Sequence, residues 1–327
     1  MKKQHLILIS LLVIIGGYYY YSSNSNSTTT RIERRDFAVN EIELVDKIVI
    51  TSKAPSKVEL IKHGEHWMVN NNFKARPSSM KYILKTLNKM EIKHPVQKNS
   101  IDQILNDMAA ISIKVDVYKN GKKDKTLYIG NNTPDEKGTY MLLEGGLSPY
   151  AIHIPGFEGY LRSRFIYDPM LWKSKEVMNI EQKNIEWLTM EYPNQKEASF
   201  KLVQNGKTIS LFDSQNNPQP IKSMVARNYL TAFKNIAHEG FIMASDPVQP
   251  EEIITLPKIF NLTIKEKGKP EYTLRSFQKT EYVKTEDGNG FYQKVDKNRL
   301  YATNGESYFI IQYFVFNPML KQLADFK

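Results

Sequence analysis

The sequence predicts an α+β protein, in which an N-terminal transmembrane helix is followed by a tandem duplication of an antiparallel-sheet unit with one long covering helix per copy. Three observations predict this class: an apolar leader, segments of alternating polarity separated by glycine turns, and a repeated order of those segments. We expect a signal anchor at residues 1–21, a flexible linker at 22–38, a first α+β repeat at 39–176 and a second at 177–327.

Composition excludes several classes of protein. The 327 residues are 41% hydrophobic and 24% charged, which suits about two domains with buried cores and not a disordered or polytopic membrane chain. The absence of Cys excludes disulfides, thiolate zinc sites and cysteine nucleophiles. Lysine and arginine exceed the acidic residues by 10, a moderate basic excess.

The leader begins with basic residues. An apolar run of 16 residues follows, from Leu6 to Tyr21. As a helix this run is about 24 Å long, shorter than a hydrocarbon core of about 30 Å. Its last four residues are tyrosines, which suit the membrane–water interface. We therefore expect an uncleaved signal anchor; a cleaved signal peptide and a buried soluble helix are the alternatives.

The anchor predicts the location of the rest of the chain. Lys2 and Lys3 are balanced by Arg31, Arg34 and Arg35 beyond the apolar run, so charge alone does not set the orientation. Leaders at the extreme N-terminus normally direct the remainder of the chain across the membrane. We expect a single-pass protein of the cytoplasmic (inner) membrane with its C-terminal bulk outside the cytoplasm, on a polar tether at residues 22–30.

Two helices of similar pattern suggest the duplication. In residues 77–90, apolar side chains recur every three or four positions, which predicts a helix with one buried face. The same stripe recurs 146 positions later, at residues 223–236. The stripes consist of Met80, Ile83, Leu84, Leu87 and Met90 and of Ala226, Tyr229, Leu230, Phe233 and Ile236.

The flanking segments agree in order and kind. Each helix follows three short predicted strands, and each precedes a short second helix and about four more strands. For the short helices, Ser100 with Gln103 predicts a capping box and Pro250 predicts a first turn. Both copies end in a similar motif, FIYDPML at residues 165–171 and FVFNPML at 314–320. Two such units would form a cleft, a common place for ligands.

Several motifs in the first copy resemble a known family. The stretch from Glu65 to Asn70, EHWMVN, precedes FKARP and the first helix; GTYMLLEG follows at residues 138–145, then IHIPGFEGYL at 152–161 and Leu171-Trp172. These motifs resemble those of the family called domain of unknown function 4340. The resemblance is good over residues 46–172 and loose over the second copy. The resemblance implies membrane-anchored, exported bacterial proteins of Bacteroidetes-like genomes, similar to auxiliary domains of ABC-type export or gliding systems. It assigns no reaction and therefore no catalytic residue.

The histidines and acidic pairs favour ordinary structural roles. His63 and His66 form the only close histidine pair, but no third ligand lies near them and they lack metalloprotease spacing. His153 lies in an apolar predicted strand, where a buried ring is the simpler interpretation and a ligand contact the alternative. Asp135 and Glu136 sit in a predicted solvated turn. No nucleophile elbow, phosphate loop or dinucleotide motif occurs, so we predict neither catalytic residues nor a metal or cofactor.

The basic and aromatic residues suggest contacts with a partner. Lysines around residues 119–125 and 265–269 read as hairpin tips that discourage edge pairing, and we expect no nucleic acid. Arg162 and Arg164 are separated by one residue, so their side chains could point to the same face and contact an acidic partner. Aromatics gather near Tyr160 and Trp172, and in residues 308–316; core packing explains most of them, and an exposed patch would contact a protein or glycan.

These observations favour a non-enzymatic, membrane-tethered envelope protein that binds or scaffolds an envelope protein partner, in keeping with an auxiliary role in ABC-type export. A module that binds a small glycan or lipid ligand in the cleft between repeats is the second hypothesis, and an envelope hydrolase is the third. The candidate contact residues are His153, Tyr160, Arg162, Arg164 and Trp172.

Overall fold

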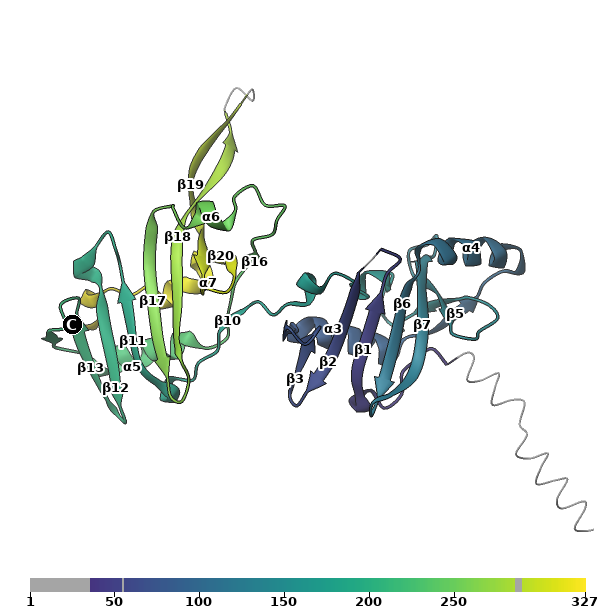
Figure 1. Cartoon of the computed structure of the whole chain (residues 1–327), viewed down its shortest axis with the longest axis horizontal. Coiled ribbons are helices and arrows are strands. Elements are labelled where there is room, and N and C mark those ends of the chain that lie inside the picture. Colours follow the sequence, from purple (N-terminus) through teal and green to yellow (C-terminus); the bar gives the residue numbers. More distant parts are fainter. Residues whose placement is uncertain (1–35, 55, 286–289) are drawn as a thin grey trace, which may run out of the picture. The chain divides into compact units, whose positions relative to one another are not determined.

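The computed structural model describes residues 36–54, 56–285 and 290–327. The chain divides between Ser174 and Lys175 into two compact units, called here the first and the second unit (Figure 1). Each is built on a nine-stranded antiparallel sheet with a few helices, so the α+β class is confirmed.

The sheet of the first unit has the strand order β4-β3-β2-β1-β6-β7-β8-β9-β5. Two α-helices, α3 (Pro77–Lys89) and α4 (Ile101–Ile111), and four 3₁₀ turns connect the strands. The strands are β1 (Val45–Thr51), β2 (Lys57–His63), β3 (His66–Val69), β4 (Phe73–Lys74), β5 (Glu91–Pro95), β6 (Ile113–Lys119), β7 (Lys122–Asn132), β8 (Thr139–Leu143) and β9 (Tyr150–His153). The turns are η1 (Ile42–Leu44), η2 (Lys98–Ser100), η3 (Arg162–Arg164) and η4 (Pro169–Trp172).

The large sheet of the second unit has the order β14-β13-β12-β11-β17-β18-β19-β20-β16, and β10 (Glu176–Met178) pairs separately with β15 (Ile236–Ala237). Its strands are β11 (Ile185–Glu191), β12 (Phe200–Asn205), β13 (Thr208–Asp213), β14 (Pro218–Gln219), β16 (Gly240–Phe241), β17 (Lys258–Glu266), β18 (Glu271–Lys284), β19 (Phe291–Thr303) and β20 (Tyr308–Gln312). The helices and turns are α5 (Ser223–Tyr229), α6 (Pro250–Ile253), α7 (Tyr313–Phe316), η5 (Gln182–Asn184), η6 (Lys196–Ala198), η7 (Leu230–Phe233), η8 (Asn317–Met319) and η9 (Leu323–Phe326).

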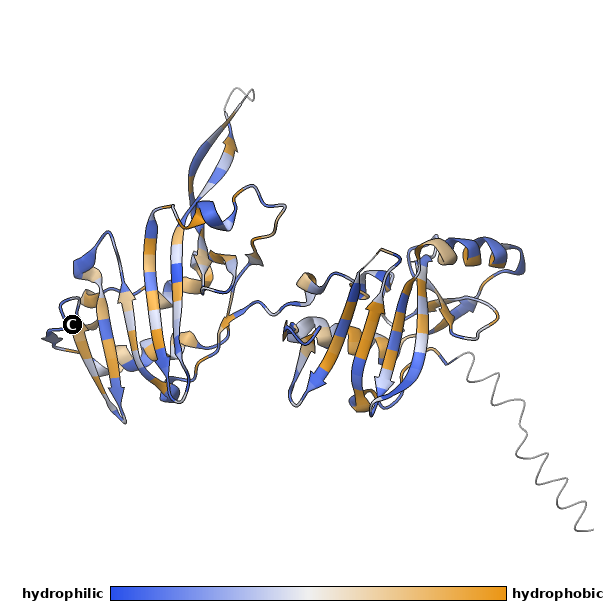
Figure 2. Ribbon diagram, in the orientation of Figure 1, coloured by the Kyte–Doolittle hydropathy of each residue, from blue (hydrophilic) through white to orange (hydrophobic). Residues whose placement is uncertain are grey.

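Hydrophobic and hydrophilic residues alternate along the strands of both sheets (Figure 2), and the apolar face of each sheet is buried in a core. In β6, Ile113, Val115 and Val117 are all buried, at most 2% exposed. Helix α3 adds Ile83 and Leu87 to the same core, which confirms the predicted stripe. Its N-terminus begins at a proline, where a missing N–H costs nothing.

The covering helix of the second unit is shorter than expected. Residues 223–236 were predicted to be one long helix, but α5 ends at Tyr229 and a 3₁₀ turn follows. The hydroxyl of Thr231 donates to the Asn228 carbonyl at 2.7 Å and so competes with the helical ladder. The buried stripe survives this change, because Tyr229 and Phe233 still face the core.

The predicted capping box of α4 is wrong. Ser100 is the N-cap, but its backbone is αR because η2 runs directly into the helix, so its side chain does not cap. Its hydroxyl contacts Asn99 instead, and Gln103 donates to Asp107 at 2.9 Å. In α6, Pro250 does occupy the first turn, as predicted.

The two closing motifs match in letters and differ in burial. Phe165 is 1% exposed, whereas Phe314, which shares its place in the motif, is 89% exposed. Tyr167 is 43% exposed and its counterpart Phe316 is 1% exposed. Residues at the same place in the two motifs therefore do not have equivalent environments in the two units.

The predicted anchor, from Leu6 to Tyr21, lies outside the described residues. Within the part of the chain that the structure describes, no helix is both long enough and apolar enough to cross a membrane. Phe37 is buried in the core of the first unit, so packing begins before the predicted linker ends at residue 38.

Candidate functional site

One cavity of the first unit contains two of the predicted contact residues. It has a volume of about 530 Å³ and lies where residues 160–171, after β9, pass the ends of β6 and β7. Tyr160, Arg162, Tyr167 and Leu171 line it. Tyr160, Tyr167 and Leu171 are each 39–51% exposed, so this surface is partly apolar.

Arg162 is held by backbone carbonyls. Its Nη1 donates to Ile129 at 2.8 Å and to Gly130 at 2.9 Å, and its Nη2 donates to Ile111 at 2.7 Å. Burial lowers the pKa of this guanidinium. Arg162 therefore fastens its own segment to β7 and to the end of α4.

Arg164 takes separate partners. Its Nη1 donates to the hydroxyl of Thr86, on α3, at 2.9 Å, and its guanidinium lies 4.3 Å from the ring centroid of Phe157. Burial lowers its pKa as well. The two arginines are joined to different elements, so the acidic-partner face expected from their alternation is not formed among the described residues.

The remaining candidates lie apart from this cavity. Half-buried His153 lines a separate hollow of about 300 Å³ together with Lys93, Lys137 and Glu158. Trp172 is 1% exposed, and its Nε1 donates to the Ile166 carbonyl at 2.9 Å. Trp172 is thus a core residue and has almost no surface to offer a ligand.

The other sequence motifs have local partners. His63 pairs with His66 across the β2–β3 turn, and their ring centroids are 6.5 Å apart. Asp135 is not simply solvated, because Lys93 lies 2.6 Å from its carboxylate and holds its pKa well below the usual range. Among the described residues, no group of three acidic or histidine side chains could hold a metal ion.

The second unit carries a feature that the sequence-based candidates did not include. Strands β18 and β19 continue past their sheet as a two-stranded extension, named here the hairpin arm and defined as residues 280–284 and 291–295 (Figure 1). The pairing of β17 with β18 reaches only Phe277, and that of β20 with β19 begins at Arg299. Among the described residues, each arm strand therefore pairs only with the other, and no further strand covers its outer edge.

The arm exposes apolar side chains on both faces. Tyr282, Phe291, Tyr292 and Val295 are 49–69% exposed. Because directly opposed residues share a face, the pairs Tyr282–Gln293, Lys284–Phe291 and Thr280–Val295 place three of the four on one side. The amide of Gln293 donates to the Tyr282 hydroxyl at 2.7 Å, which orders this side.

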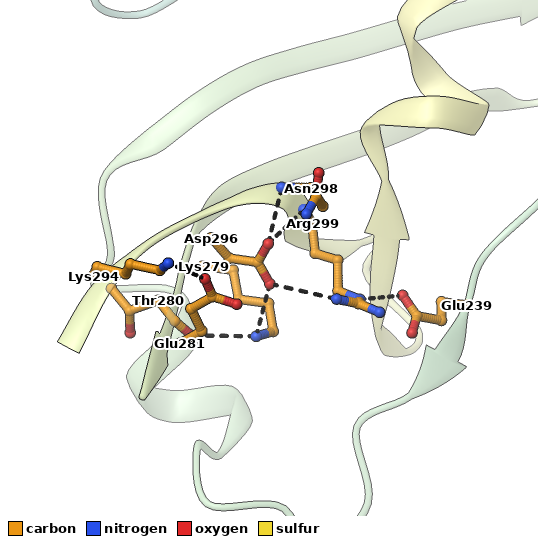
Figure 3. A network of polar contacts seen from close by, with 8 residues as sticks. All are labelled: Glu239, Lys279, Thr280, Glu281, Lys294, Asp296, Asn298 and Arg299. Carbon is orange, nitrogen blue, oxygen red and sulfur yellow. Dashed lines mark hydrogen bonds and ion pairs between the residues drawn. The ribbon is translucent and has the colours of Figure 1, made fainter. Parts of the chain in front are cut away.

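A buried carboxylate fixes the base of the arm (Figure 3). Residues 296–299 of β19 bulge opposite Lys279 of β18, and Asp296, 2% exposed, lies within this bulge. It accepts from the backbone N–H groups of Asn298 at 2.9 Å and Arg299 at 3.1 Å, and from Lys279 Nζ at 3.3 Å. Arg299 also donates to Glu239 at 2.6 Å. The base is thus cross-linked by charge-assisted hydrogen bonds.

The sequence-based prediction did not include the arm, because that prediction rested on features that the two halves of the chain share. The corresponding strands of the first unit, β7 and β8, end at Asn132 and begin again at Thr139, with no such extension. A signal was present, namely the unusual length of alternating sequence at residues 271–303 around an Asp-Gly and an Asn-Gly dipeptide.

Comparison with known proteins identifies the family. The model described as "Domain of unknown function (DUF4340)" matches residues 67–253, from β3 to the end of α6, which is more than half of the chain. The match crosses into the second unit, which the resemblance covers only loosely. No curated protein and no solved structure matches the chain. The chain belongs to the DUF4340 family.

Proposed function

We propose that this protein is a non-enzymatic, membrane-tethered component of the cell envelope that binds a partner protein through the hairpin arm. The observation that carries the proposal is the arm itself, which joins two open backbone edges to four exposed apolar side chains. We infer that the protein has an auxiliary role beside ABC-type export machinery.

The open edges favour a polypeptide as the occupant. A two-stranded ribbon alone is marginally stable in water, and unpaired N–H and C=O groups at its edges are templates for a further strand. A lipid surface has no strand that could pair in register with these edges. Between Thr280 and Val295 the chain also has two lysines against three carboxylates, so it lacks the positive charge that binds anionic headgroups.

Photo-crosslinking in cells tests the docking. A photoreactive phenylalanine analogue replaces Tyr292 on the arm or, as a matched control, Tyr82, a 61% exposed tyrosine on α3. We expect a discrete crosslinked envelope protein from position 292 and not from position 82, and its loss when Phe291→Ser and Tyr282→Ser are combined. Equal products from both positions, or a product that survives the double change, would contradict the proposal.

Cysteine labelling tests the location. The chain has no Cys, so Lys267→Cys in the exposed β17–β18 turn gives a single thiol in the full chain. We expect a membrane-impermeant maleimide to label this thiol from outside the cytoplasmic membrane, without disruption of that membrane. Labelling only after the membrane is opened would place the second unit in the cytoplasm and overturn the proposed orientation.

We also propose that the two units arose by duplication. The proposal is supported by their strand orders, which coincide when strands are matched along the chain, β1 with β11 and β6 with β17. In both, the principal helix follows the fourth matched strand. An experimental structure tests this by superposition, which should align all nine strand pairs except the arm. Matched strands that fail to align would contradict it.

A further inference from the structure

A second site lies at one end of the large sheet in the second unit, away from the hairpin arm in the sequence. It is a cavity of about 470 Å³ between the β11–β12 connection and the turn that follows β13. In β11 and β17, Met190 and Leu262 point into the core, so their neighbours Glu191 and Asn261 lie on the opposite face. These two residues are paired across the strands and line the cavity.

The cavity gathers three lysines without acidic partners. Lys196 comes from η6, Lys201 from β12 and Lys258 from the start of β17. Among the described residues, none of these ammonium groups lies within 4.0 Å of a carboxylate. Two lysines of the predicted hairpin tips differ, since Lys119 and Lys123 are ion-paired.

The cavity has an excess of positive charge, because its three lysines outnumber its two carboxylates, Asp213 and Glu191. Asp213 accepts from the backbone N–H groups of Gln215 at 3.0 Å and Asn217 at 2.9 Å, and from the Gln219 amide at 2.9 Å. These bonds lower the pKa of Asp213 and direct its charge into its own turn. Glu191 makes only a long contact, 3.4 Å, with the amide nitrogen of Asn261.

One residue that lines the cavity has an unused acceptor. Asn261 Oδ1 is buried and has no hydrogen-bond partner among the described residues. An acceptor without a partner destabilises the free protein, so a ligand hydroxyl that reaches this atom forms a hydrogen bond that the free protein lacks. The half-buried residues Tyr192 and Pro193 supply apolar surface to the cavity, and the Tyr192 hydroxyl is already bonded to the Lys321 carbonyl at 2.7 Å.

We propose that this cavity binds a carboxylated sugar. The lysines would hold the carboxylate, Asn261 Oδ1 would accept from a ring hydroxyl, and the apolar surface would pack against a sugar face. The volume lies in the range of small-ligand sites and suits one or two sugar rings. This inference does not depend on the hairpin arm or on the proposed partner.

Calorimetric titration of the full chain in detergent micelles tests the site. The probe is a digalacturonate, and lactose is the neutral control of similar size. We expect digalacturonate to bind and lactose not to bind, with binding weakened by added salt. Equal heats for the two sugars, or no heat from digalacturonate, would overturn the proposal.

Variants locate the binding. Lys201→Gln and Lys258→Gln should each raise the dissociation constant about tenfold, the effect of losing one charge-assisted contact. Asn261→Leu should weaken binding while leaving the circular dichroism spectrum unchanged. Lys267→Gln, at an exposed turn outside the cavity, is the matched control and should bind normally. A control that binds as weakly as the cavity variants, or inorganic phosphate that competes as well as digalacturonate, would refute a sugar site.

Discussion

Arg162 and Trp172 are conspicuous in the sequence, and the structure gives both a role in holding the fold together. The Arg162 guanidinium donates hydrogen bonds to three backbone carbonyls, and the Trp172 indole donates one to the Ile166 carbonyl inside the core. Chemically distinctive side chains are often used in this way where an irregular segment must be fixed to a sheet. Residues 160–172 are such a segment, since they hold two short turns and no strand.

Replacement of Trp172 tests this role. Trp172→Phe removes the 2.9 Å hydrogen bond to Ile166 and part of a ring that is 1% exposed, so the free energy of unfolding should fall by roughly 1–3 kcal/mol. Urea denaturation measures the change. Tyr160→Phe, at a 39% exposed ring, should change stability by less than about 0.5 kcal/mol. A Trp172 variant as stable as the control would show that the indole is not structural.

The pair of Glu239 and Arg299 predicts a pH dependence. The hydrogen bond from Arg299 lowers the pKa of Glu239 from its ordinary value of 4.5, so the pair stabilises the fold above that value. The stabilisation is lost as the pH falls below 4.5 through the folded pKa. Thermal unfolding from pH 3 to 6 should show a shallower acid slope for Glu239→Gln than for the natural chain. Arg299→Gln should flatten the slope similarly, and a slope unchanged in both variants would contradict the assignment.

At the scale of elements, strand existence was predictable and helix extent was not. Alternation marked β6 and the glycine turns marked the hairpins, because a half-buried strand leaves a period of two in the sequence. The stripe at residues 223–236 gave the buried face correctly. It could not show that Thr231 would bond to Asn228 and end the α-helix early, since that choice depends on local hydrogen bonding.

Helix α4 packs closely on β7 at Gly130, and this contact can be tested. A Cβ at Gly130 would lie 2.8 Å from Met108 Cγ and 3.0 Å from the Tyr140 carbonyl oxygen. Gly130→Ala should therefore lower the free energy of unfolding by about 1–3 kcal/mol, measured by urea denaturation. Gly240→Ala is the control, since a Cβ there meets nothing within 4 Å. Equal stability of the two variants would mean that α4 shifts without cost.

At the scale of the whole molecule, the chain consists of two units with separate cores. The first main core contains residues between Phe37 and Trp172, and the second contains residues between Val177 and Phe326. The order of segments in the sequence predicted two successive α+β units. The hairpin arm and the lysine-lined cavity were not predicted. Both lie in the second unit, and a repeated pattern gives no information about a segment that occurs once.

Separate cores predict separate unfolding. Scanning calorimetry of the full chain should resolve two transitions. Trp172→Phe should lower the melting temperature of one transition only, and Phe233→Leu, in the core of the second unit, should lower only the other. A single transition that both variants shift together would show that the two units unfold as one cooperative block.

The carboxylate at the root of the hairpin arm has a mechanical consequence. Asp296 locks the bulge while β18 runs without a break from the arm into a strand paired on both sides. Tension applied by a bound protein would therefore load the hydrogen bonds of β17 and β18 along the strands, all at once, and would not unzip them singly. A protein bound at the arm would thus pull on an attachment point that resists tension along the strands.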